Sequence, residues 1–249
     1  MALQFFHDTP LGPELGDGSE ITLTGAEAHH AATVRRVRVG EQVTVSDGLG
    51  VVIEAVATFV SPKEVGLRVF ARKDVAPSTP RLVLVQALAK GGRDELAVQT
   101  ATEFGVDEVI PWQSSRSISR WEGAKAEKSR LRWEAIVREA SKQAHRAWIP
   151  RVHGVVDTPA LVAMPEDTLM LLLDPTASES LSYVKLFDIN RRGHKIALIV
   201  GPEGGFTESE IETLVAAGAE RVRLGENVLR TSSAGPAALA VLNVRLSRW

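Results

Sequence analysis

One stretch of the chain, residues 196–242, constrains the fold more than any other. It begins with an apolar, β-branched run that ends abruptly in the sequence GPEGG at 201–205. Thr207 and Glu210 follow at the spacing of a helix capping box, in which each side chain accepts a hydrogen bond from the other residue's backbone N–H. The stretch therefore predicts a strand over 196–200, then a Gly-rich turn and then a helix.

A second short strand, predicted over 220–224, leads into a turn over 225–229 and then into a long Ala/Leu-rich segment with Pro236 near its start. Both turns then open at the same end of a sheet. In open α/β sheets, ligands bind in the crevice outside the carboxyl ends of the strands. We therefore expect a small-molecule site where these two turns meet.

The composition limits the class of protein. A chain of 249 residues can form one large domain or two modest ones. The absence of cysteine excludes disulfides, thiol nucleophiles and thiolate metal sites, and it is typical of a reducing cytoplasm. The N-terminus lacks the pattern of a secretory signal, and every apolar run is far shorter than the ~20 residues of a membrane span. We expect a soluble, cytoplasmic protein with no membrane partner.

The first domain, expected over residues 1–74, carries the signals of a small β-rich module. Thr24 and Glu27 predict a capping box for one helix, which leads to an arginine triplet at 35, 36 and 38. A compact barrel or sandwich that displays these arginines is the expected structure. Short runs rich in Val, Ile and Thr, separated by turn residues, predict strands over 20–25, 42–48, 51–60 and 64–73.

The second domain is expected over residues 81–249, after a linker at 76–80 in which two prolines favour extended chain. Strands and helices alternate in it as they do in α/β proteins, so we expect a mostly parallel sheet. The predicted strands are 81–88, 106–112, 151–155, 168–173 and 195–200, and the predicted helices are 94–105 and 122–147.

The GPEGG turn allows more than one interpretation. It can be a simple tight connection, since Gly supplies positive φ and Pro initiates turns. A phosphate-binding loop fits poorly, because the turn matches neither GxGxxG nor GxxxxGK[ST], Pro202 lacks a donor N–H, and Glu203 places a carboxylate beside the phosphates. A ligand with a sulfonium or ammonium group, or one recognised by backbone groups, suits the turn better.

The charges are unevenly distributed along the chain. Residues 114–151 hold ten Lys and Arg against four Glu, a net of +6, while residues 201–226 hold six Glu against two Arg, a net of −4. Trp121, Trp133 and Trp148 lie among the cations of the basic segment. Cations neutralise phosphates and aromatic rings stack on unpaired bases, so the segment indicates contact with nucleic acid. A solvated helix face, with tryptophans in the core or in a dimer contact, is the alternative.

Two other kinds of site have no support in the sequence. The six histidines are scattered, and the adjacent His29 and His30 cannot share one face of a helix, so we expect no metal site. A serine nucleophile is equally unsupported, because the chain has no GxSxG motif and Ser232 and Ser233 have no evident base partner.

With these residues in view, the chain resembles the RsmE family, SPOUT-class methyltransferases that methylate N3 of a uridine in 16S ribosomal RNA of the small subunit. The resemblance spans nearly the whole chain. Its most specific parts are IVGPEGGFTESE at 199–210, LGENVLRTSSA at 224–234 and QTATEFGVDEVIPWQSSRS at 99–117. Weaker matches are HHAATVRRVRVGE at 29–41 and EASKQAHR at 139–146.

The resemblance implies an α/β fold in which a small, RNA-binding PUA-like β-barrel precedes a SPOUT-type domain, a mostly parallel sheet tied into a trefoil knot. It also implies a homodimer, and S-adenosyl-L-methionine as the cofactor. Ten residues of the crevice match the family's cofactor-binding positions: Leu172, Leu173, Val200, Gly201, Glu203, Gly204, Leu224, Gly225, Val228 and Leu229.

The implied reaction is an in-line transfer of a methyl group from the sulfonium to N3 of the uridine. The N3 proton must be lost and the resulting negative charge stabilised as the methyl group approaches. Arg230 matches the arginine of the family's L-R-T motif and is predicted to contact the target base or its developing charge. Six residues match positions that contact RNA or close the site: Arg36, Lys90, Arg93, Arg116, Gln143 and Arg146.

The sequence departs from the family pattern at three places. Ser232 stands where the family's L-R-T-E-T-A motif has a carboxylate, Glu226-Asn227 stands where Pro-Arg is usual, and Thr100 stands where a lysine is common. The departure at Ser232 questions a catalytic role for a carboxylate at that position. A non-catalytic RNA-binding or ribosome-assembly protein of the same fold is the alternative function. A nucleotide-dependent α/β enzyme is disfavoured because phosphate-binding motifs are missing.

Overall fold

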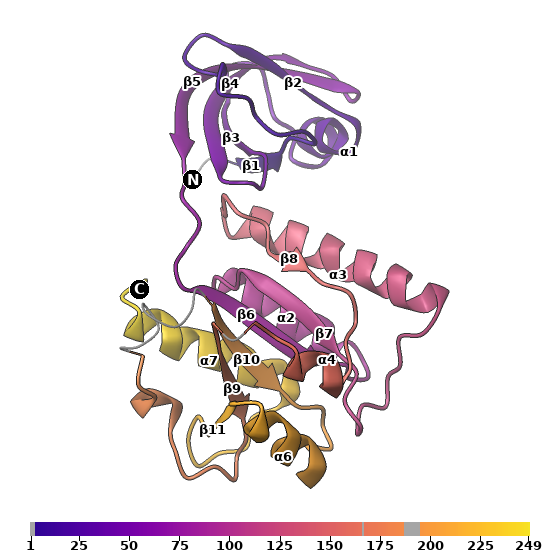
Figure 1. Ribbon diagram of the computed structural model, residues 1–249. Coiled ribbons are helices and arrows are strands. Elements are labelled where there is room, and N and C mark those ends of the chain that lie inside the picture. The colour runs from indigo at the N-terminus through magenta and orange to yellow at the C-terminus, as the bar shows by residue number, and fades with distance from the viewer. Residues whose placement is uncertain (1–2, 166, 187–194) are drawn as a thin grey trace. The chain divides into compact units, whose positions relative to one another are not determined.

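The computed structural model describes residues 3–165, 167–186 and 195–249 (Figure 1). Contacts between residues group the chain into two compact units. Unit 1 comprises Met1–Pro77 together with Ser141–Ile149, and unit 2 comprises Ser78–Ala140 and Pro150–Trp249. The domain bounds expected from the sequence, 1–74 and 81–249, take no account of the segment 141–149 that returns to unit 1.

Unit 1 is built on a curled sheet of five strands in the order β1-β3-β4-β5-β2 (Figure 1). β1 pairs with β3 in parallel, and all other neighbours in this sheet are antiparallel. Alternate residues point inward and form one apolar core, which holds Phe5, Leu23 and Ile53 among others. The strands are β1 Leu3–Phe6, β2 Glu20–Thr24, β3 Gln42–Ser46, β4 Val51–Val60 and β5 Glu64–Asp74.

The predicted helix of unit 1 is present, but its predicted capping box is wrong. The helix α1 spans Gly25–His29 and continues as a π-helical turn, η1, over His30–Val34. Thr24 makes no capping hydrogen bond with its side chain. The Glu27 carboxylate instead turns into the interior, where it accepts hydrogen bonds from Phe6 N at 3.3 Å and from Lys142 Nζ at 2.8 Å. A buried ion pair formed with a distant residue therefore replaces the local cap.

Lys142 belongs to the returning segment 141–149, which begins in the last turn of the long helix α3, Ala124–Gln143. The helix ends at Gln143 rather than at the predicted 147, and His145 adopts a φ of 52° as the chain turns away. Backbone hydrogen bonds then join Gly50 N to the Ala147 carbonyl and Ile149 N to the Gly48 carbonyl, each at 3.0 Å. The pattern of charges continues smoothly past 143, so these long-range bonds, which the sequence does not show, decide where the helix ends.

Unit 2 contains a six-stranded sheet in the order β11-β9-β10-β6-β7-β8, and every neighbouring pair is parallel. The expectation of an α/β unit with a mostly parallel sheet is confirmed. The strands predicted over 168–173 and 195–200 have those bounds, whereas those predicted over 151–155 and 220–224 are shorter. The strands are β6 Arg81–Ala87, β7 Glu108–Trp112, β8 Arg151–Val152, β9 Thr168–Leu173, β10 Lys195–Val200 and β11 Glu220–Val222.

Helices cover both faces of this sheet (Figure 1). Val83 and Val85 of β6 point to the face covered by α4 and α6, and Leu82 and Leu84 point to the face covered by α7. The helix α7 follows edge strand β11 and crosses back to pack on β10, β6 and α2, the kind of return that a knotted chain requires. The helices are α2 Arg93–Glu103, α4 Thr158–Val162, α6 Glu208–Ala216 and α7 Thr231–Arg245, with a 3-10 turn, η2, at Leu181–Tyr183.

The crossing of α7 over the sheet depends on a glycine. A Cβ atom at Gly235 would lie 2.7 Å from Cδ1 of Leu84, well inside van der Waals contact. Gly235 thus lets the helix backbone approach β6 more closely than any other residue would. Most of the other residues over 232–240 are Ser or Ala, so this part of the helix carries small side chains where it packs on the sheet.

The amino end of the sheet holds a buried carboxylate among cations. Glu108, Arg81 and Lys195 are the first residues of β7, β6 and β10. Lys195 Nζ lies 2.7 Å from Glu108 Oε1, and His153 Nε2 lies 2.8 Å from Glu108 Oε2. The hydrogen bond from His153, together with the Lys195 ammonium, outweighs the effect of burial and holds the pKa of Glu108 at about 2.

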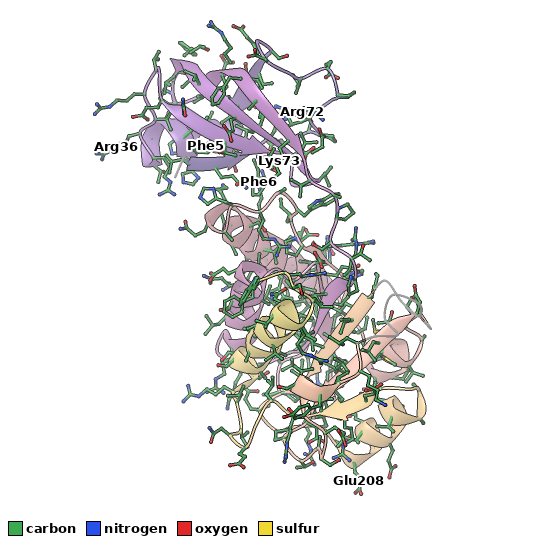
Figure 2. All side chains as sticks on the ribbon, turned by 90° about the vertical axis from the view of Figure 1, so that its left-hand side faces the viewer. Phe5, Phe6, Arg36, Arg72, Lys73 and Glu208 are labelled. Atoms are coloured by element: carbon green, nitrogen blue, oxygen red, sulfur yellow. The ribbon has the colours of Figure 1, made fainter. Side chains whose placement is uncertain are left out.

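This cluster predicts an acid-dependent contribution to stability. The pKa of Glu108 lies below its ordinary 4.5, so the charged carboxylate stabilises the folded state above pH 4.5, and this contribution disappears as the pH falls to about 2. We expect the free energy of unfolding, measured with urea, to decrease more steeply between pH 4.5 and 2 for the wild type than for Glu108→Gln. Glu208→Gln, which changes the exposed side chain labelled in Figure 2, is the control and should keep the wild-type slope. Equal slopes for wild type and Glu108→Gln would show that Glu108 does not make this acid-dependent contribution to stability.

Candidate active site

One cavity of about 570 Å³ lies in unit 2 beyond the carboxyl ends of β9, β10 and β11. Because these strands are parallel, the three loops that follow them meet at the same edge of the sheet (Figure 1). The volume falls within the range of about 300–1,000 Å³ that is typical of small-molecule sites. The two turns singled out from the sequence both border it, as predicted.

Most of the predicted cofactor residues lie in the cavity wall. Leu172 and Gly204 do not. Leu172 points to the opposite face of β9, into the core beneath α4 and α6, because successive side chains of a strand alternate. Gly204 faces Arg116, whose Cβ would lie 3.3 Å from a Cβ atom at that glycine. The eight that line the cavity are Leu173, Val200, Gly201, Glu203, Leu224, Gly225, Val228 and Leu229, and Arg230 and Arg93 also border it.

The loop after β9, which no sequence motif indicated, supplies Asp174, Pro175 and Thr176 to the wall. Asp174 accepts hydrogen bonds from Thr176 N at 2.9 Å, from Thr176 Oγ1 at 2.8 Å and from Arg221 Nε at 2.9 Å. Burial raises the pKa of Asp174, but these hydrogen bonds outweigh it and hold the pKa below its ordinary value. The predicted end of this strand at 173 was the available signal, since a loop that follows a parallel strand lies at the ligand edge.

Glu203 does not present a free charge to the cavity. Its Oε1 accepts a hydrogen bond from Arg93 Nη1 at 2.8 Å. Burial raises the pKa of Glu203, but its own backbone N–H and the Arg93 guanidinium together hold the pKa below the ordinary range. The partner of Glu203 lies 110 positions earlier in the chain, so the sequence around Glu203 does not show that its charge is already paired.

An aromatic pair packs against the GPEGG turn. Phe206 stacks on Trp112 of β7, with ring centroids 5.8 Å apart and planes inclined by 25°. A Cβ atom at Gly201 would lie 3.2 Å from the Phe206 ring, so a side chain at 201 would press on this stack. Gly205 adopts a φ of 69°, which L side chains rarely adopt. The two glycines therefore have separate roles, one in packing and one in turning the chain.

The loop after β7 forms hydrogen bonds with the GPEGG turn and with helix α6. The predicted capping box between Thr207 and Glu210 is confirmed at the start of α6. Glu210 also accepts a hydrogen bond from Ser115 N at 2.7 Å. Arg116 Nη1 donates to the carbonyl oxygens of Gly204 at 2.8 Å and of Phe206 at 2.9 Å. Ser115 and Arg116, which follow β7, thus hold both the GPEGG turn and the beginning of helix α6.

Comparisons with known proteins agree with this geometry. The family of RNA methyltransferase domains matches residues 77–243, and the family of RNA methyltransferase PUA domains matches residues 23–70. Ribosomal RNA small subunit methyltransferase E of Mycobacterium tuberculosis is 40% identical over 256 residues, which cover 100% of this chain and 94% of the relative. The protein of the same name from Bacillus subtilis is 28% identical, with 92% of each chain covered. The chain belongs to the ribosomal RNA small subunit methyltransferase E family.

Solved structures extend this likeness to the whole fold. The crystal structure of ribosomal RNA small subunit methyltransferase E from Neisseria gonorrhoeae, bound to S-adenosyl methionine, has a TM-score of 0.86 and 28% identity, with 98% of each chain covered. A putative methyltransferase from Legionella pneumophila, in complex with SAM, has a TM-score of 0.85 and 29% identity, also with 98% of each chain covered. The expected PUA-like module ahead of a SPOUT-type α/β domain is confirmed for this member of the methyltransferase E family.

In the basic segment, residues 114–151, two tryptophans are buried and several cations are paired with carboxylates. Trp121 and Trp133 are 7% and 1% exposed and pack edge to face with centroids 4.9 Å apart. Arg130 pairs with Glu127 at 2.7 Å and also with Glu134, and Arg132 pairs with Glu95 at 2.6 Å. Trp121 and Trp133 are therefore core residues, and the expectation that they offer stacking surfaces to bases is wrong.

The six residues predicted to contact RNA or close the site are divided between the units. Arg93 and Arg116 hold the GPEGG turn, and Lys90 is exposed on the loop before α2. In unit 1, Gln143 is exposed, and the backbone carbonyl of Arg146 accepts a hydrogen bond from Gln4 Nε2 at 2.8 Å. Arg36 of unit 1 has a φ of 55°, and Figure 2 shows its side chain pointing away from the sheet.

The part of the chain that the structure describes shows neither a metal-binding cluster nor a membrane-spanning helix. Within residues 3–165, 167–186 and 195–249, the structure contains no group of three or more His, Cys, Asp or Glu side chains that could hold a metal ion. Among the same residues, no helix is both long enough and apolar enough to span a membrane.

The contacts of Arg116 predict that this side chain stabilises the GPEGG turn. Arg116→Ala removes two hydrogen bonds to loop carbonyls, each worth about 0.5–1.5 kcal/mol. Together the two losses amount to about 1–3 kcal/mol, so we expect amide hydrogen exchange in a peptide covering 203–207 to become about 5- to 150-fold faster. Lys128→Ala, which removes an exposed cation from the same basic segment, is the matched control and should leave this exchange unchanged. Equal exchange in wild type and Arg116→Ala would show that these hydrogen bonds do not hold the turn.

Proposed function

We propose that this protein transfers a methyl group from S-adenosyl-L-methionine to N3 of a specific uridine in 16S ribosomal RNA, and that it does so in the cytoplasm as a homodimer. One observation carries the proposal. The loops after β9, β10 and β11 enclose a cavity lined by eight of the ten residues that the family resemblance assigns to the cofactor, with Arg230 beside them. The S-adenosyl methionine bound by the Neisseria gonorrhoeae relative supports this choice of cofactor.

The wall of the cavity fits a ligand of this chemistry. Leu173, Val200 and Leu224 offer apolar side chains that suit a purine ring, and Gly201 and Gly225 leave backbone groups accessible for recognition of its edge. When bound there, S-adenosyl-L-methionine supplies an electrophilic methyl group on a sulfonium. The turn that carries Gly201 is held by Arg116 and by the Phe206–Trp112 stack, so contacts within the protein hold this part of the wall without a ligand.

Arg230 is proposed as the catalytic residue. It is exposed, borders the cavity and stands at the N-cap of α7. The N3–H of uridine is a weak acid, so negative charge develops on the base as its proton leaves and the new N–C bond forms. A guanidinium donates hydrogen bonds to such charge from a planar, permanently charged group. The helix α7 has no acidic residue in its first turn, and the proposal assigns no general base.

The alternative function is a non-catalytic RNA-binding or ribosome-assembly protein of the same fold. Ser232, which stands where the family has a carboxylate, is the observation that favours it. Calorimetry with S-adenosyl-L-methionine separates the two functions, since the alternative requires no cofactor. Absence of binding at millimolar concentration would favour the alternative.

The proposed reaction is tested directly on RNA. The protein is incubated with S-adenosyl-L-methionine and small subunits, or free 16S rRNA, from a strain without the corresponding gene. A methyl group on N3 blocks Watson–Crick pairing, so reverse transcription should then stop at one uridine. The same RNA incubated without cofactor is the control. If no new stop appears with either substrate, the proposed reaction is wrong.

The homodimer rests on the family resemblance and on one exposed apolar side chain that borders the cavity. Val228 is 77% exposed although it is apolar, which is the kind of surface that a second copy of the chain would cover. Sedimentation equilibrium should give twice the chain mass at micromolar concentration. A mass of one chain under these conditions would contradict the dimer.

Arg230→Ala should abolish most of the turnover while sparing the cofactor. Removing one donor that stabilises a developing charge costs about 10²–10³ in kcat. We expect a loss of this size in methyl transfer to rRNA, and a Kd for S-adenosyl-L-methionine within about threefold of wild type by calorimetry. Arg230→Lys, which keeps the charge but not the planar guanidinium, should have a kcat between those of the wild type and Arg230→Ala. Unchanged turnover in Arg230→Ala would remove the residue from the mechanism.

Arg36 is proposed to contact phosphate. Each lost contact to a single-stranded phosphate reduces the slope of log K against log salt concentration by about 0.7. We expect Arg36→Ala to weaken RNA binding and to lower this slope by about that amount, measured by fluorescence anisotropy at several salt concentrations. Lys73→Ala removes a charge from another exposed position of unit 1, labelled in Figure 2, and serves as the control. An equal effect of both changes would indicate a general effect of charge and not a contact.

A further inference from the structure

A buried polar side chain lies directly beneath the active-site cavity. Gln86 belongs to the strand β6 and is completely buried. It is the only polar residue among the six buried residues of that strand. On the face of β6 that α7 covers, Leu82 and Leu84 make ordinary apolar contacts, and only the position nearest the cavity carries an amide. A buried amide costs free energy unless its hydrogen bonds are made, so packing alone does not explain it.

Gln86 begins a chain of hydrogen bonds that ends at the GPEGG turn. Its Nε2 donates to Thr231 Oγ1 at 2.9 Å and to the Ala87 carbonyl at 3.1 Å. Thr231 Oγ1 in turn donates to the Gly201 carbonyl at 2.8 Å. A hydroxyl has one hydrogen, so accepting from Gln86 and donating to Gly201 fixes its direction. The hydroxyl of Thr231, which is 6% exposed, therefore links the centre of the sheet to the turn.

The residues that this chain connects belong to three different segments of the site. Gly201 and Thr231 both line the cavity, and Arg230 immediately precedes Thr231. Thr231 is the first residue of α7, and Arg230 before it makes no side-chain cap. The hydrogen bond from the Thr231 hydroxyl to the Gly201 carbonyl therefore holds the beginning of this helix to the GPEGG turn. A change in the Thr231–Gly201 distance would shift Arg230 relative to the GPEGG turn.

Another observation points to a role beyond packing. Among the described residues, none donates a hydrogen bond to Gln86 Oε1, although this atom is buried. A native structure that keeps an unsatisfied acceptor gives up stability at that position. Leucine or methionine at position 86 would avoid this cost but would leave Thr231 without its donor.

We propose that Gln86 and Thr231 are positioning residues, which set the distance between the cofactor-binding turn at 201–205 and Arg230. The proposal rests on the proposed methyl transfer. In this role neither side chain is assigned a contact with the reacting atoms. They act by keeping the wall that holds the methyl donor and the arginine that faces the target base in one arrangement. In-line transfer is sensitive to such alignment, and a displacement near 1 Å can lower the rate by about 10²-fold.

The test is a pair of substitutions at Thr231. Thr231→Val keeps the shape and removes the hydroxyl, whereas Thr231→Ser keeps the hydroxyl. We expect Thr231→Val to lower kcat about 10- to 100-fold with the KM for S-adenosyl-L-methionine within about threefold of wild type, and Thr231→Ser to restore most of kcat. Thr102→Val removes another buried hydroxyl, which donates to the Val98 carbonyl at 2.8 Å within α2, and should change stability without changing kcat.

A readout without substrate separates this inference from the proposed reaction. Amide hydrogen exchange of the unliganded protein in peptides covering 200–206 and 228–234 should be faster in Thr231→Val than in wild type or Thr231→Ser. If the wild type transfers no methyl group, the proposed function fails, and the exchange data still decide whether the hydrogen bonds hold these segments together. Wild-type kcat in folded Thr231→Val, or equal damage in Thr231→Val and Thr231→Ser, would overturn the positioning role.

Gln86→Met provides a second route if Thr231→Val does not fold. Methionine has a similar length and volume but no donor, so Thr231 would lose the partner that directs its hydroxyl. We expect a fall in kcat in the same range as for Thr231→Val. In the double variant the losses should not add, because both changes break one chain of hydrogen bonds. Fully additive losses would show that the two residues act independently and would contradict the proposal.

Discussion

Parallel pairing of β9, β10 and β11 is the constraint on which the active site depends. Parallel neighbours cannot be joined by tight hairpins, so each strand must be followed by a crossover that returns the chain to the other end of the sheet. The loops that begin these crossovers all leave from the same edge. That edge therefore collects backbone and side chains from segments around residues 174, 201 and 224, which are far apart in the sequence but enclose one cavity.

The loops at this edge contain little regular structure, and side chains from elsewhere hold them. Glu210 joins the helix cap of α6 to the loop after β7, and Arg116 from the same loop binds two carbonyls of the GPEGG turn. Arg93 at the start of α2 neutralises Glu203 from another direction. A Gly-rich turn would by itself be flexible, so these long-range contacts decide its conformation.

Features that depend on local pattern could be predicted from the sequence. The apolar runs of β9 and β10 and the Thr207–Glu210 capping box follow from neighbouring residues, and the structure confirms them. Features that depend on distant partners could not. Thr24 and Glu27 have the same capping-box spacing, yet Lys142 draws Glu27 into the interior. Trp121 and Trp133 lie in a strongly charged stretch, but their burial depends on tertiary packing that composition does not reveal.

The same distinction applies within the site. All six residues that match the family's RNA-contacting or site-closing positions could be named from motifs, but the ion pair between Arg93 and Glu203 could be seen only in the fold. Gln86 gave a weak signal as a lone amide in an apolar strand. Its partner lies 145 positions away, and only the return of α7 across the sheet brings them together.

The segment 141–149 has a consequence for the order in which the chain folds. During synthesis the strands of unit 1 emerge first, but the lysine that pairs with Glu27 and the carbonyl that binds Gly50 N arrive only after more than sixty further residues, 78–140, have been made. Unit 1 therefore cannot form the Glu27–Lys142 ion pair until the first part of unit 2, residues 78–140, has been made. Completion of the first unit is thereby linked to the synthesis of the second.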